Sequence, residues 1–589
     1  MRAAPRGSAG LGPDEASRIP SRVKALRPST LSLALGMAFA ALGAQAQQAP
    51  PVPNIGDALR QVQPPVLPAP KAAPLPTVGG TAIEPPMLAL PGSGPGIRVD
   101  SFAIVGNRVV DSAVLLALVQ PDQGKTLSLA ELELIATRIT RYYRSAGYFV
   151  ARAYIPAQEV AAGTLTIRVV EGNYGRFILA NRSRVRDDIV QGLLDDIKDR
   201  DIVSLDTLER AMLVINDTPG VTVVRADVMP GEAVGTSDFA IGTEATPAYG
   251  GYALLDNYGS AYTGKQRLSF NADWNSPSGR GDRLSVSGMA TRHSGLLNGR
   301  LGYSGLLGTD GTRGELALSR TRYQLGSTYA ALDASGTADA LEFNLTRPVK
   351  RTRGASIEAG LSLAYKSLKD EVASTSTRTR KKAATASASV SARNEQELFG
   401  FDGLTQASAA LTIGRLRFDD ATAAALDAAG AGTQGSFAKL NLQVTRATAL
   451  PGQFALTTSA RAQLALNDKN LDGSERMSVS GFSGVIAYPS GELSGDHAAL
   501  LHVDLAHPLP PAGTLQMSAS AFADIGWART ANPLPGAASR SLSDVGVGLT
   551  ANAAGGLVRL QLAQRVSGGA PTSEPASRLR VLLQGGWVF

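Results

Sequence analysis

The feature that most limits the fold is the final segment of the chain, RLRVLLQGGWVF, which ends on Phe589. Its apolar side chains share one strand face and its polar side chains the other: Leu579, Val581, Leu583, Trp587 and Phe589 against Arg578, Arg580 and Gln584. A strand between lipid and water needs this alternation, with an aromatic residue at the boundary. The segment therefore predicts a strand of a transmembrane β-barrel.

The same alternation recurs over roughly 350 upstream residues, at the spacing of about 10 residues per strand that membrane barrels use. The clearest segments are RLSVSGMAT, LEFNLTRP, SIEAGLSLAYKS, FAKLNLQVT, ALLHVDLAH, TLQMSASAFADIGW and GLVRLQLAQR. This length accommodates an even number of strands in the mid-teens, although periodicity does not settle the count. A soluble β-sandwich is the alternative, and the terminal aromatic strand, an export signal and the absence of cysteine all disfavour it.

The N-terminus predicts export. Basic residues precede the apolar stretch LSLALGMAFAALG and the small-residue site Ala44-Gln45-Ala46, so residues 1–46 are expected to be a signal peptide. That segment carries six Lys/Arg and two Asp/Glu, a net of +4, so the mature chain keeps only +3 of the formal +7. Nucleic acid is therefore not an expected partner. Residues 47–96 are expected to be a Pro-rich linker that contains one short helix at about 53–63.

Two α/β units follow the linker. The first, at 97–175, has the order β-α-α-β-β, with a helix in SLAELELIATRITRYYRSAG and strands in YFVARAYIP and GTLTIRVVEG. A second, shorter copy is expected at 176–231, with helices in VRDDIVQGLLDDI and SLDTLERAMLVINDTPG. Two copies of one supersecondary unit predict a tandem pair of interaction modules.

Three phrases resemble a known family. TLTIRVVEG and LERAMLVINDTPGVTV with MPGEAVGTSD resemble the two periplasmic POTRA domains of two-partner secretion transporters, the TpsB or ShlB/FhaC/HecB family. LLDNYGSAYTGKQRLS resembles the first-strand signature of that family, carried here by Asp256, Asn257, Gly259, Thr263 and Gly264. The resemblance implies a membrane all-β barrel of about 16 antiparallel strands at 236–589, preceded by two small α/β POTRA domains. It also implies a lumen crossed by a plug helix at 53–63 and by an inward loop at about 466–496.

The inward loop departs from the family pattern. The family tip carries an arginine that an acidic residue of a neighbouring strand holds, whereas this chain has Val485-Ile486-Ala487-Tyr488-Pro489, with Ile486 in place of the arginine. The other family elements are present, namely Gly495-Asp496 and Phe522-x-Asp524-x-Gly526. A buried carboxylate without a cation is costly. Asp524 is therefore expected either to use another partner, with Arg476 as the candidate, or to leave the loop less firmly held.

Enzyme motifs are weak in this chain. Gly259 to Lys265 matches phosphate-loop spacing, but Gln266 stands where Ser or Thr is needed and a strand follows. His502 and His507 fall on opposite faces of one strand, which argues against shared metal ligation; solvated positions are expected for them and for His497. No nucleophile elbow occurs. The sequence therefore predicts no enzymatic activity, no cofactor and no metal site.

The predicted function is that of an outer-membrane translocator in a Gram-negative bacterium. The resemblance implies that periplasmic POTRA domains bind the N-terminal domain of an unfolded exoprotein, which then crosses the barrel without ATP. Expected partners are this adhesin- or haemolysin-like exoprotein, outer-membrane lipid and the barrel-assembly machinery, for which Phe589 would be the assembly signal. The alternatives are a barrel-assembly insertase and a passive porin or surface-binding barrel.

Overall fold

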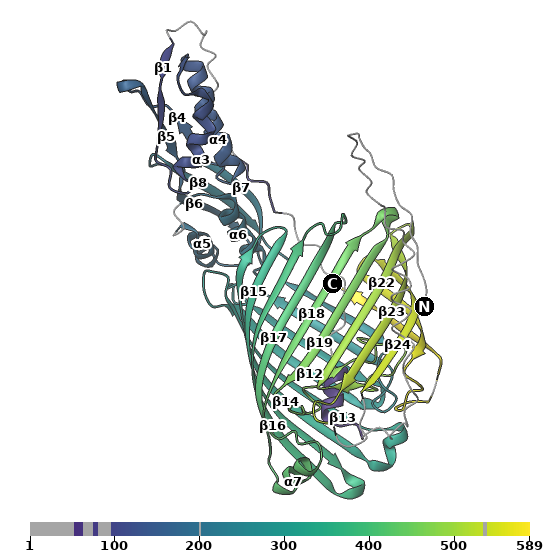
Figure 1. The fold of residues 1–589 in the computed structure, drawn as a ribbon. Helices are drawn as coiled ribbons and strands as arrows, with labels where there is room; N and C mark the ends of the chain where they lie inside the picture. Colours follow the sequence, from purple (N-terminus) through teal and green to yellow (C-terminus); the bar gives the residue numbers. More distant parts are fainter. Residues whose placement is uncertain (1–51, 63–74, 80–95, 199–201, 534–538, 576) are drawn as a thin grey trace, which may run out of the picture. The chain divides into compact units, whose positions relative to one another are not determined.

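The computed structural model describes residues 52–62, 75–79, 96–198, 202–533, 539–575 and 577–589 (Figure 1). The expected signal peptide and most of the Pro-rich linker lie outside these residues. Among the helices described, none has both the length and the apolar character that a membrane-crossing helix requires.

Sixteen of the described strands from residue 249 onward close into an antiparallel barrel, in which β26 pairs with β9; β20 (Met477–Ser478) and β21 (Ser494–Gly495) form a separate two-stranded sheet. The barrel strands are β9 (Tyr249–Asp256), β10 (Arg267–Asn275), β11 (Arg283–Thr291), β12 (Leu296–Leu306), β13 (Arg313–Gln324), β14 (Ala334–Arg351), β15 (Ala355–Val372), β16 (Thr377–Glu395), β17 (Gly403–Phe418), β18 (Gly435–Ala449), β19 (Ala455–Leu466), β22 (His497–Ala512), β23 (Leu515–Arg529), β24 (Arg540–Ala553), β25 (Gly556–Ser567) and β26 (Leu579–Val588). The predicted barrel class and strand number are confirmed.

The apolar and polar side chains of the last strand lie on opposite faces of the barrel wall, as expected. Leu579, Val581 and Leu583 are each about half exposed on the outer wall, whereas Gln584 is buried on the other face. Phe589 and Gly251 exchange two main-chain hydrogen bonds of 2.8 and 3.0 Å beside the closing β26–β9 pair. The terminal residue therefore contributes to closing the barrel.

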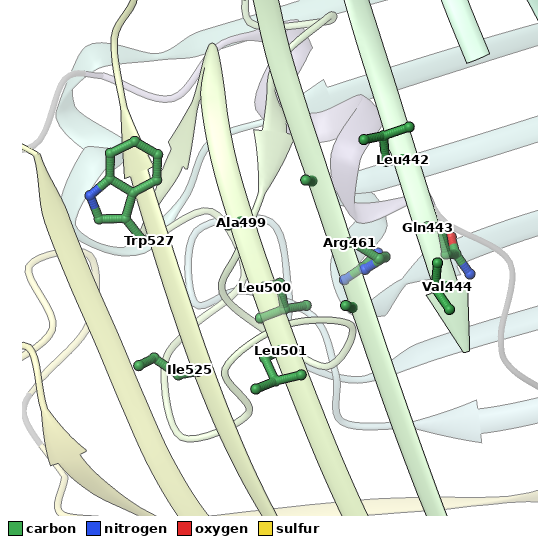
Figure 2. A pocket seen from close by; sticks show the side chains of 11 residues that line it. Leu442, Gln443, Val444, Arg461, Ala499, Leu500, Leu501, Ile525 and Trp527 are labelled. Carbon is green, nitrogen blue, oxygen red and sulfur yellow. The ribbon is translucent and has the colours of Figure 1, made fainter. Parts of the chain in front are cut away.

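The outer wall is apolar where neighbouring strands meet. A shallow depression of about 410 Å³ lies over β18, β19, β22 and β23, where Leu442, Val444, Leu501 and Ile525 are exposed. Figure 2 shows the side chains that line it. Because a soluble protein rarely leaves such contiguous apolar surface uncovered, this wall suits contact with lipid.

The first α/β unit is a three-stranded sheet of order β2-β5-β4 covered by two helices. Its elements are β2 (Ser101–Val105), α3 (Ser112–Val119), α4 (Leu129–Ser145), β4 (Arg152–Tyr154) and β5 (Thr164–Val170), with a small added pair of β1 (Ile97–Val99) and β3 (Lys125–Leu127). Ser128 and Glu131 form a capping box that starts α4. The buried face of α4, including Leu132, Ile135 and Ile139, packs on the core of this unit.

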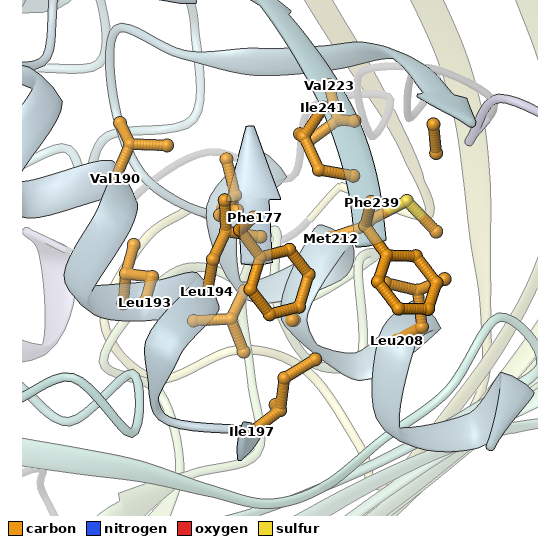
Figure 3. Close-up of a cluster of buried hydrophobic side chains, with 14 of the residues drawn as sticks. Phe177, Val190, Leu193, Leu194, Ile197, Leu208, Met212, Val223, Phe239 and Ile241 are labelled. Carbon is orange, nitrogen blue, oxygen red and sulfur yellow. The ribbon is translucent and has the colours of Figure 1, made fainter. Parts of the chain in front are cut away.

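The second unit extends further than the sequence pattern predicted. It comprises β6 (Asn173–Arg182), α5 (Asp187–Asp195), α6 (Leu205–Asn216), β7 (Thr222–Pro230) and β8 (Thr236–Glu244), with sheet order β6-β8-β7. The expected boundary at 231 and the barrel start at 236 were therefore wrong. Strand β8 belongs to this sheet because it pairs with β6 and β7, and its Phe239 and Ile241 are buried in the core between the sheet and α5–α6 (Figure 3). The second copy is not abbreviated.

The short helix of the linker is α2 (Ile55–Gln61), within the expected range 53–63. The side chain of Asn54 accepts from the amide of Gly56, and a capping box with Asp57 completes its start. Seven residues are too few for a stable isolated helix in water. Its stability must therefore come from the surface against which it packs.

Candidate functional site: the helix and loop inside the barrel

Helix α2 packs against inward-facing residues of the barrel wall. Ile55 and Ala58 are buried, at 0% and 2% exposure, in an apolar cluster with residues of β11 to β15 and the loops between them. The amide of Ile55 donates to Asp370 Oδ1 at 2.8 Å, and the hydroxyl of Tyr323 donates to the same oxygen at 2.8 Å. The barrel wall therefore holds the helix by both apolar burial and a hydrogen bond at its first residue.

The first-strand signature holds the other end of α2. Thr263 Oγ1 donates to Gln61 Oε1 at 2.8 Å, and Arg267 Nη1 donates to the carbonyl of Gln61 at 3.0 Å. Arg267 also forms a buried ion pair with Asp256, with Nε–Oδ1 at 2.7 Å. Its guanidinium lies 4.6 Å from the ring centroid of Phe482, which belongs to the inward loop. Arg267 thus joins the first strand, the helix and the loop.

Other signature residues shape the loop after β9. Asn257 donates to the carbonyl of Val581 and accepts from the amide of Leu583, both at 2.9 Å, so it joins β9 to β26. A side chain at Gly259 would place its Cβ 2.0 Å from the carbonyl oxygen of Gly264, and Gly264 itself has φ +104°. Only glycine fits such a close approach and such a backbone angle.

The inward loop, called loop 6 here, comprises residues 467–496 between β19 and β22. Its first half presents acidic side chains to lysines of the barrel wall. Lys381 Nζ lies 2.6 Å from Asp472 Oδ2, and Lys366 and Lys439 each lie 2.8 Å from a carboxylate oxygen of Glu475. Because both carboxylates are almost fully buried, removing one partner would leave an uncompensated charge.

The second half of loop 6 is fastened to the opposite wall through Glu492. Its carboxylate accepts from Arg540 Nη1 at 2.7 Å, from Ser573 Oγ at 2.7 Å and from the amide of Thr572 at 2.9 Å. Burial raises the pKa of Glu492, but the hydrogen bonds from Ser573, Thr572 and Arg540 outweigh it and hold that pKa below its ordinary value. The charged form is therefore the one that these donors stabilise.

The loop tip is held by apolar packing instead of the family arginine. Ile486 is 4% exposed and contacts a cluster of Tyr258, Phe522, Ala563 and Leu582. Burying a side chain of this size contributes about 1.5–3 kcal/mol.

Polar contacts flank Ile486 in the tip. The amide of Ala487 donates to Asp544 Oδ2 at 2.5 Å, and the hydroxyl of Tyr488 donates to the carbonyls of Ser567 and Gly569 at 2.7 and 2.8 Å. This packing and these bonds hold the tip, and that it is held less firmly than a tip with an arginine stays a prediction. Val485 completes the tip and is fully buried, while Pro489 accepts from the amide of Glu492 at 3.3 Å.

Asp524 has a partner, but it is not Arg476. His502 Nδ1, on the neighbouring strand β22, lies 2.6 Å from Asp524 Oδ1. Arg476 instead pairs with Asp496, with Nε–Oδ1 at 2.9 Å, at the base of loop 6. The Arg476 assignment was therefore wrong, and so was the expectation that His502 is merely solvated. The prediction failed because strand register, rather than sequence distance, decides which side chains face one another.

Two signature residues of β23, Phe522 and Gly526, lie against loop 6. Phe522 packs on Ile486, and a Cβ at Gly526 would lie 3.0 Å from atoms of Val479 and Val485, so the loop approaches the strand closely there. Gly495 is similarly restricted, since a Cβ would lie 2.7 Å from the carbonyl oxygen of Arg529. Asp524 lies between Phe522 and Gly526 on β23, and it is in register with Asp544 of β24.

Several residues of this site carried no recognisable signal in the sequence: Arg267, Lys366, Lys381, Lys439, Glu492, His502 and Asp544. Their contacts cross between strands or join the barrel wall to α2 and loop 6, so local spacing could not identify them. The phosphate-loop-like segment forms the turn that contacts α2, and its Lys265 pairs with Glu574 at 3.2 Å. Over the described part of the chain, no group of three metal-ligating side chains is suitably placed for a metal ion.

Comparisons with known proteins agree with this arrangement. A family model described as haemolysin secretion/activation protein ShlB/FhaC/HecB matches residues 235–551, and a model of the ShlB-type POTRA domain matches residues 97–172. The heme/hemopexin transporter protein HuxB of Haemophilus influenzae (strain 86-028NP) is 28% identical over 438 residues, covering 73% of this chain and 76% of HuxB. The outer membrane transporter CdiB of Escherichia coli is 26% identical over 195 residues, 33% of each chain.

Two solved structures share the fold. CdiB from Escherichia coli has a TM-score of 0.70 at 20% identity, covering 91% of this chain and 95% of CdiB. CdiB from Acinetobacter baumannii has a TM-score of 0.61 at 15% identity, covering 95% and 97%. Because the barrel family model spans more than half of the chain and the POTRA model precedes it, the protein belongs to the ShlB/FhaC/HecB family of haemolysin secretion/activation proteins, the outer-membrane transporters of two-partner secretion.

Proposed function

We propose that α2 and loop 6 form the gate of this transporter, and that an unfolded exported protein displaces them on its way from the POTRA domains through the barrel. The observation that carries this proposal is the position of Arg267, whose guanidinium contacts Asp256, Gln61 and Phe482 at once. A group that joins the wall, the helix and the loop couples the release of one to the release of the others.

The gate is well suited to reversible opening. Helix α2 is short and depends on its contacts, while loop 6 is held by separate ionic and apolar contacts that can be broken one after another. No chemical reaction is needed at this site, and we assign the protein no enzymatic role. Because no ATP is present in the periplasm, folding of the exported protein outside the cell supplies the drive.

We also propose three partners for this transporter: lipid, the barrel-assembly machinery and the exported protein. The apolar outer wall contacts outer-membrane lipid. The barrel-assembly machinery recognises the terminal strand, which ends at Phe589, during insertion. The POTRA domains take the N-terminal domain of the exported protein, either along a sheet edge or against a helix groove.

The test is transport by the full-length protein in proteoliposomes. The cargo would be the N-terminal domain of a candidate exported protein, added unfolded on the POTRA side. We expect the cargo to become protected from added protease, and we expect protection to fall when α2 is cross-linked to the barrel wall. A folded, membrane-inserted protein that neither binds nor protects this cargo would contradict the proposal.

A further inference from the structure

A cluster of basic side chains lies on the outer face of the barrel, at one end of β15, β16 and β17. These three strands are neighbours in the barrel (Figure 1). Leu368 and Lys381 point inward, where Leu368 belongs to the cluster around α2 and Lys381 pairs with loop 6, so the residues next to them point outward. The outward cluster, called the rim patch here, consists of Lys369, Arg378, Arg380, Lys382, Arg415 and Arg417.

The rim patch lies at the extracellular end of the barrel. The POTRA domains are periplasmic in this family, and only residues 245–248 separate β8 of the second POTRA domain from β9. Strand β9 therefore begins at the periplasmic end, and each later strand of the antiparallel barrel reverses direction. By this order β15 and β17 end, and β16 begins, on the extracellular side. The rim patch occupies these three ends.

Apolar side chains lie directly below the rim patch on the same outer face. Along β17, Ile413 precedes Arg415, and along β15, Leu363 and Tyr365 precede Lys369. These three side chains are 59%, 44% and 48% exposed, respectively. Apolar residues with an aromatic residue near their edge mark the boundary of the lipid-facing band of a barrel. The rim patch is therefore at the level of the lipid head groups.

Strand register places like charges opposite each other within the rim patch. Lys369 of β15 is directly opposite Arg380 of β16, and Lys382 of β16 is directly opposite Arg417 of β17. Like charges at facing positions of an antiparallel pair destabilise the sheet. An anion bound between the two cations of such a pair removes that cost, because each cation then faces an opposite charge. The rim patch therefore has two positions that suit an anion.

Acidic side chains neutralise only part of the rim patch. Glu371 accepts from Lys369 Nζ at 2.8 Å and from Arg378 Nη2 at 2.9 Å, and Lys382 Nζ lies 3.2 Å from Asp419 Oδ1. Six basic side chains against these two carboxylates leave a net charge of +4. Three guanidinium groups have no hydrogen-bond or ion-pair partner among the described residues, namely those of Arg380, Arg415 and Arg417.

The positive charge is concentrated on one side of the barrel. Beyond β14, the exposed Arg320 and Arg322 of β13 extend the basic surface. On five other strands the outward residue near the extracellular end is an exposed leucine: Leu255, Leu268, Leu297, Leu464 and Leu579. An even ring of charge would serve general solvation, whereas a local patch above an apolar wall is typical of a binding site for an anionic amphiphile.

We propose that the rim patch binds the head group of a phosphorylated, multiply acylated lipid of the extracellular leaflet, of the chemical class of lipid A. Its phosphates lie at the Lys369–Arg380 and Lys382–Arg417 pairs, and its acyl chains lie on the apolar wall below. Arginine pairs with phosphate oxygens in bidentate geometry, and lysine adds a point charge. Two facing pairs favour a head group with two phosphates over a head group with one.

The test uses the full-length protein in detergent, with lipid A as the probe and native mass spectrometry as the measure of bound lipid. Arg380→Gln with Arg417→Gln removes one cation from each facing pair. Both side chains are exposed, so the heat-modifiable barrel should persist. The matched control is Arg182→Gln with Lys350→Gln, which removes two exposed cations outside the rim patch. Arg380→Lys with Arg417→Lys keeps both charges.

We expect the glutamine variant to bind lipid A at least about tenfold more weakly than the wild type, because two charge-assisted contacts are lost. The matched control should bind as the wild type does, and the lysine variant should keep more affinity than the glutamine variant. Dephosphorylated lipid A and inorganic phosphate should each bind the wild type at least about tenfold more weakly than lipid A, because each lacks one half of the ligand. Equal affinity of the wild type and the glutamine variant for lipid A would overturn the inference, and so would equal affinity of the wild type for lipid A and phosphatidylglycerol.

Thermal unfolding in detergent gives a second measurement, in which the sign of the effect depends on the lipid. Without lipid, the glutamine variant should unfold at a higher temperature than the wild type, because repulsion within the facing pairs is relieved. Saturating lipid A should raise the unfolding temperature of the wild type more than that of the variant, because a ligand stabilises the state that binds it. Equal stabilisation of both proteins by lipid A would show that the lipid acts on the apolar wall alone, and the assignment of the rim patch would fail.

Discussion

The contact between α2 and loop 6 offers a test in which two physical effects have opposite signs. Gly56 lies in the first turn of α2, where a built Cβ would be 2.4 Å from the carbonyl carbon of Gly473 and 2.5 Å from the amide nitrogen of Ser474. Both are backbone atoms, so they cannot rotate away. Gly56→Ala should therefore push the helix off loop 6, even though alanine is the better helix former.

The magnitudes favour opening. Replacing glycine by alanine stabilises a helix by about 0.5–1 kcal/mol. Overpacking of a tight contact typically costs about 1–3 kcal/mol, and two backbone contacts below 3.0 Å place this site at the upper end. The net cost of about 1–2 kcal/mol corresponds to a factor of about 5–30 in the ratio of released to docked helix.

Single-channel recording in planar bilayers measures this ratio. Deleting residues 53–63 sets the conductance of the unplugged barrel, and Gly56→Ala should reach that level about 5–30 times more often than the wild type. Val52→Ala, at an exposed position before the helix, should have no effect. Gly473→Ala is the matched change on the loop side and should be milder, because its Cβ would meet the side chain of Asn54 at 3.0 Å, which can move.

Two results would refute this reasoning. If Gly56→Ala closes the channel further, intrinsic helix stability outweighs the contact with loop 6. If deletion of residues 53–63 leaves the conductance unchanged, α2 is not a plug at all, and the segment acts only as linker.

Three further predictions concern the loop tip, its strands and the chain end. Ile486→Ala should cost about 2–5 kcal/mol at the tip, because the side chain is buried, and should expose loop 6 to protease while the heat-modifiable barrel persists; unchanged protection would contradict this. In thermal unfolding, the destabilisation by Asp524→Asn should be non-additive with that of His502→Ala and additive with that of Arg476→Ala. The reverse pattern would show that Arg476, and not His502, is the partner of Asp524. Deleting Phe589 should lower the yield of barrel in the outer membrane, and an unchanged yield would remove its assembly role.

The sequence by itself determined the class of the protein. Alternation of apolar and polar residues, as at Leu579 to Leu583, is a local consequence of the strand period and of lipid on one side, so it can be read without knowing the fold. The capping residues of α2 and α4 are local in the same sense. The signature residues Asp256 and Asp524 were also identifiable, because the segments that contain them resemble the pattern of the family.

The failures share one cause. Strand β8, Thr236–Glu244, fell within the expected barrel bounds of 236–589, and only its pairing with β6 and β7 places it in the POTRA sheet. The barrel could therefore not be separated from the second POTRA domain by pattern alone.

What only the tertiary structure decided is which distant groups meet. Lys381 contacts Asp472, and Gly79 contacts β7. The partner of Asp524 is His502 and not Arg476, the candidate from the sequence. The spacing of these residues in the sequence does not predict any of the three contacts. Barrel closure and the stagger of the strands set the position of each inward side chain along the barrel axis. A one-residue change in strand register would turn such a side chain to the outer face. Chain alternation thus specifies that a barrel forms, and the register of its closure specifies what the lumen holds.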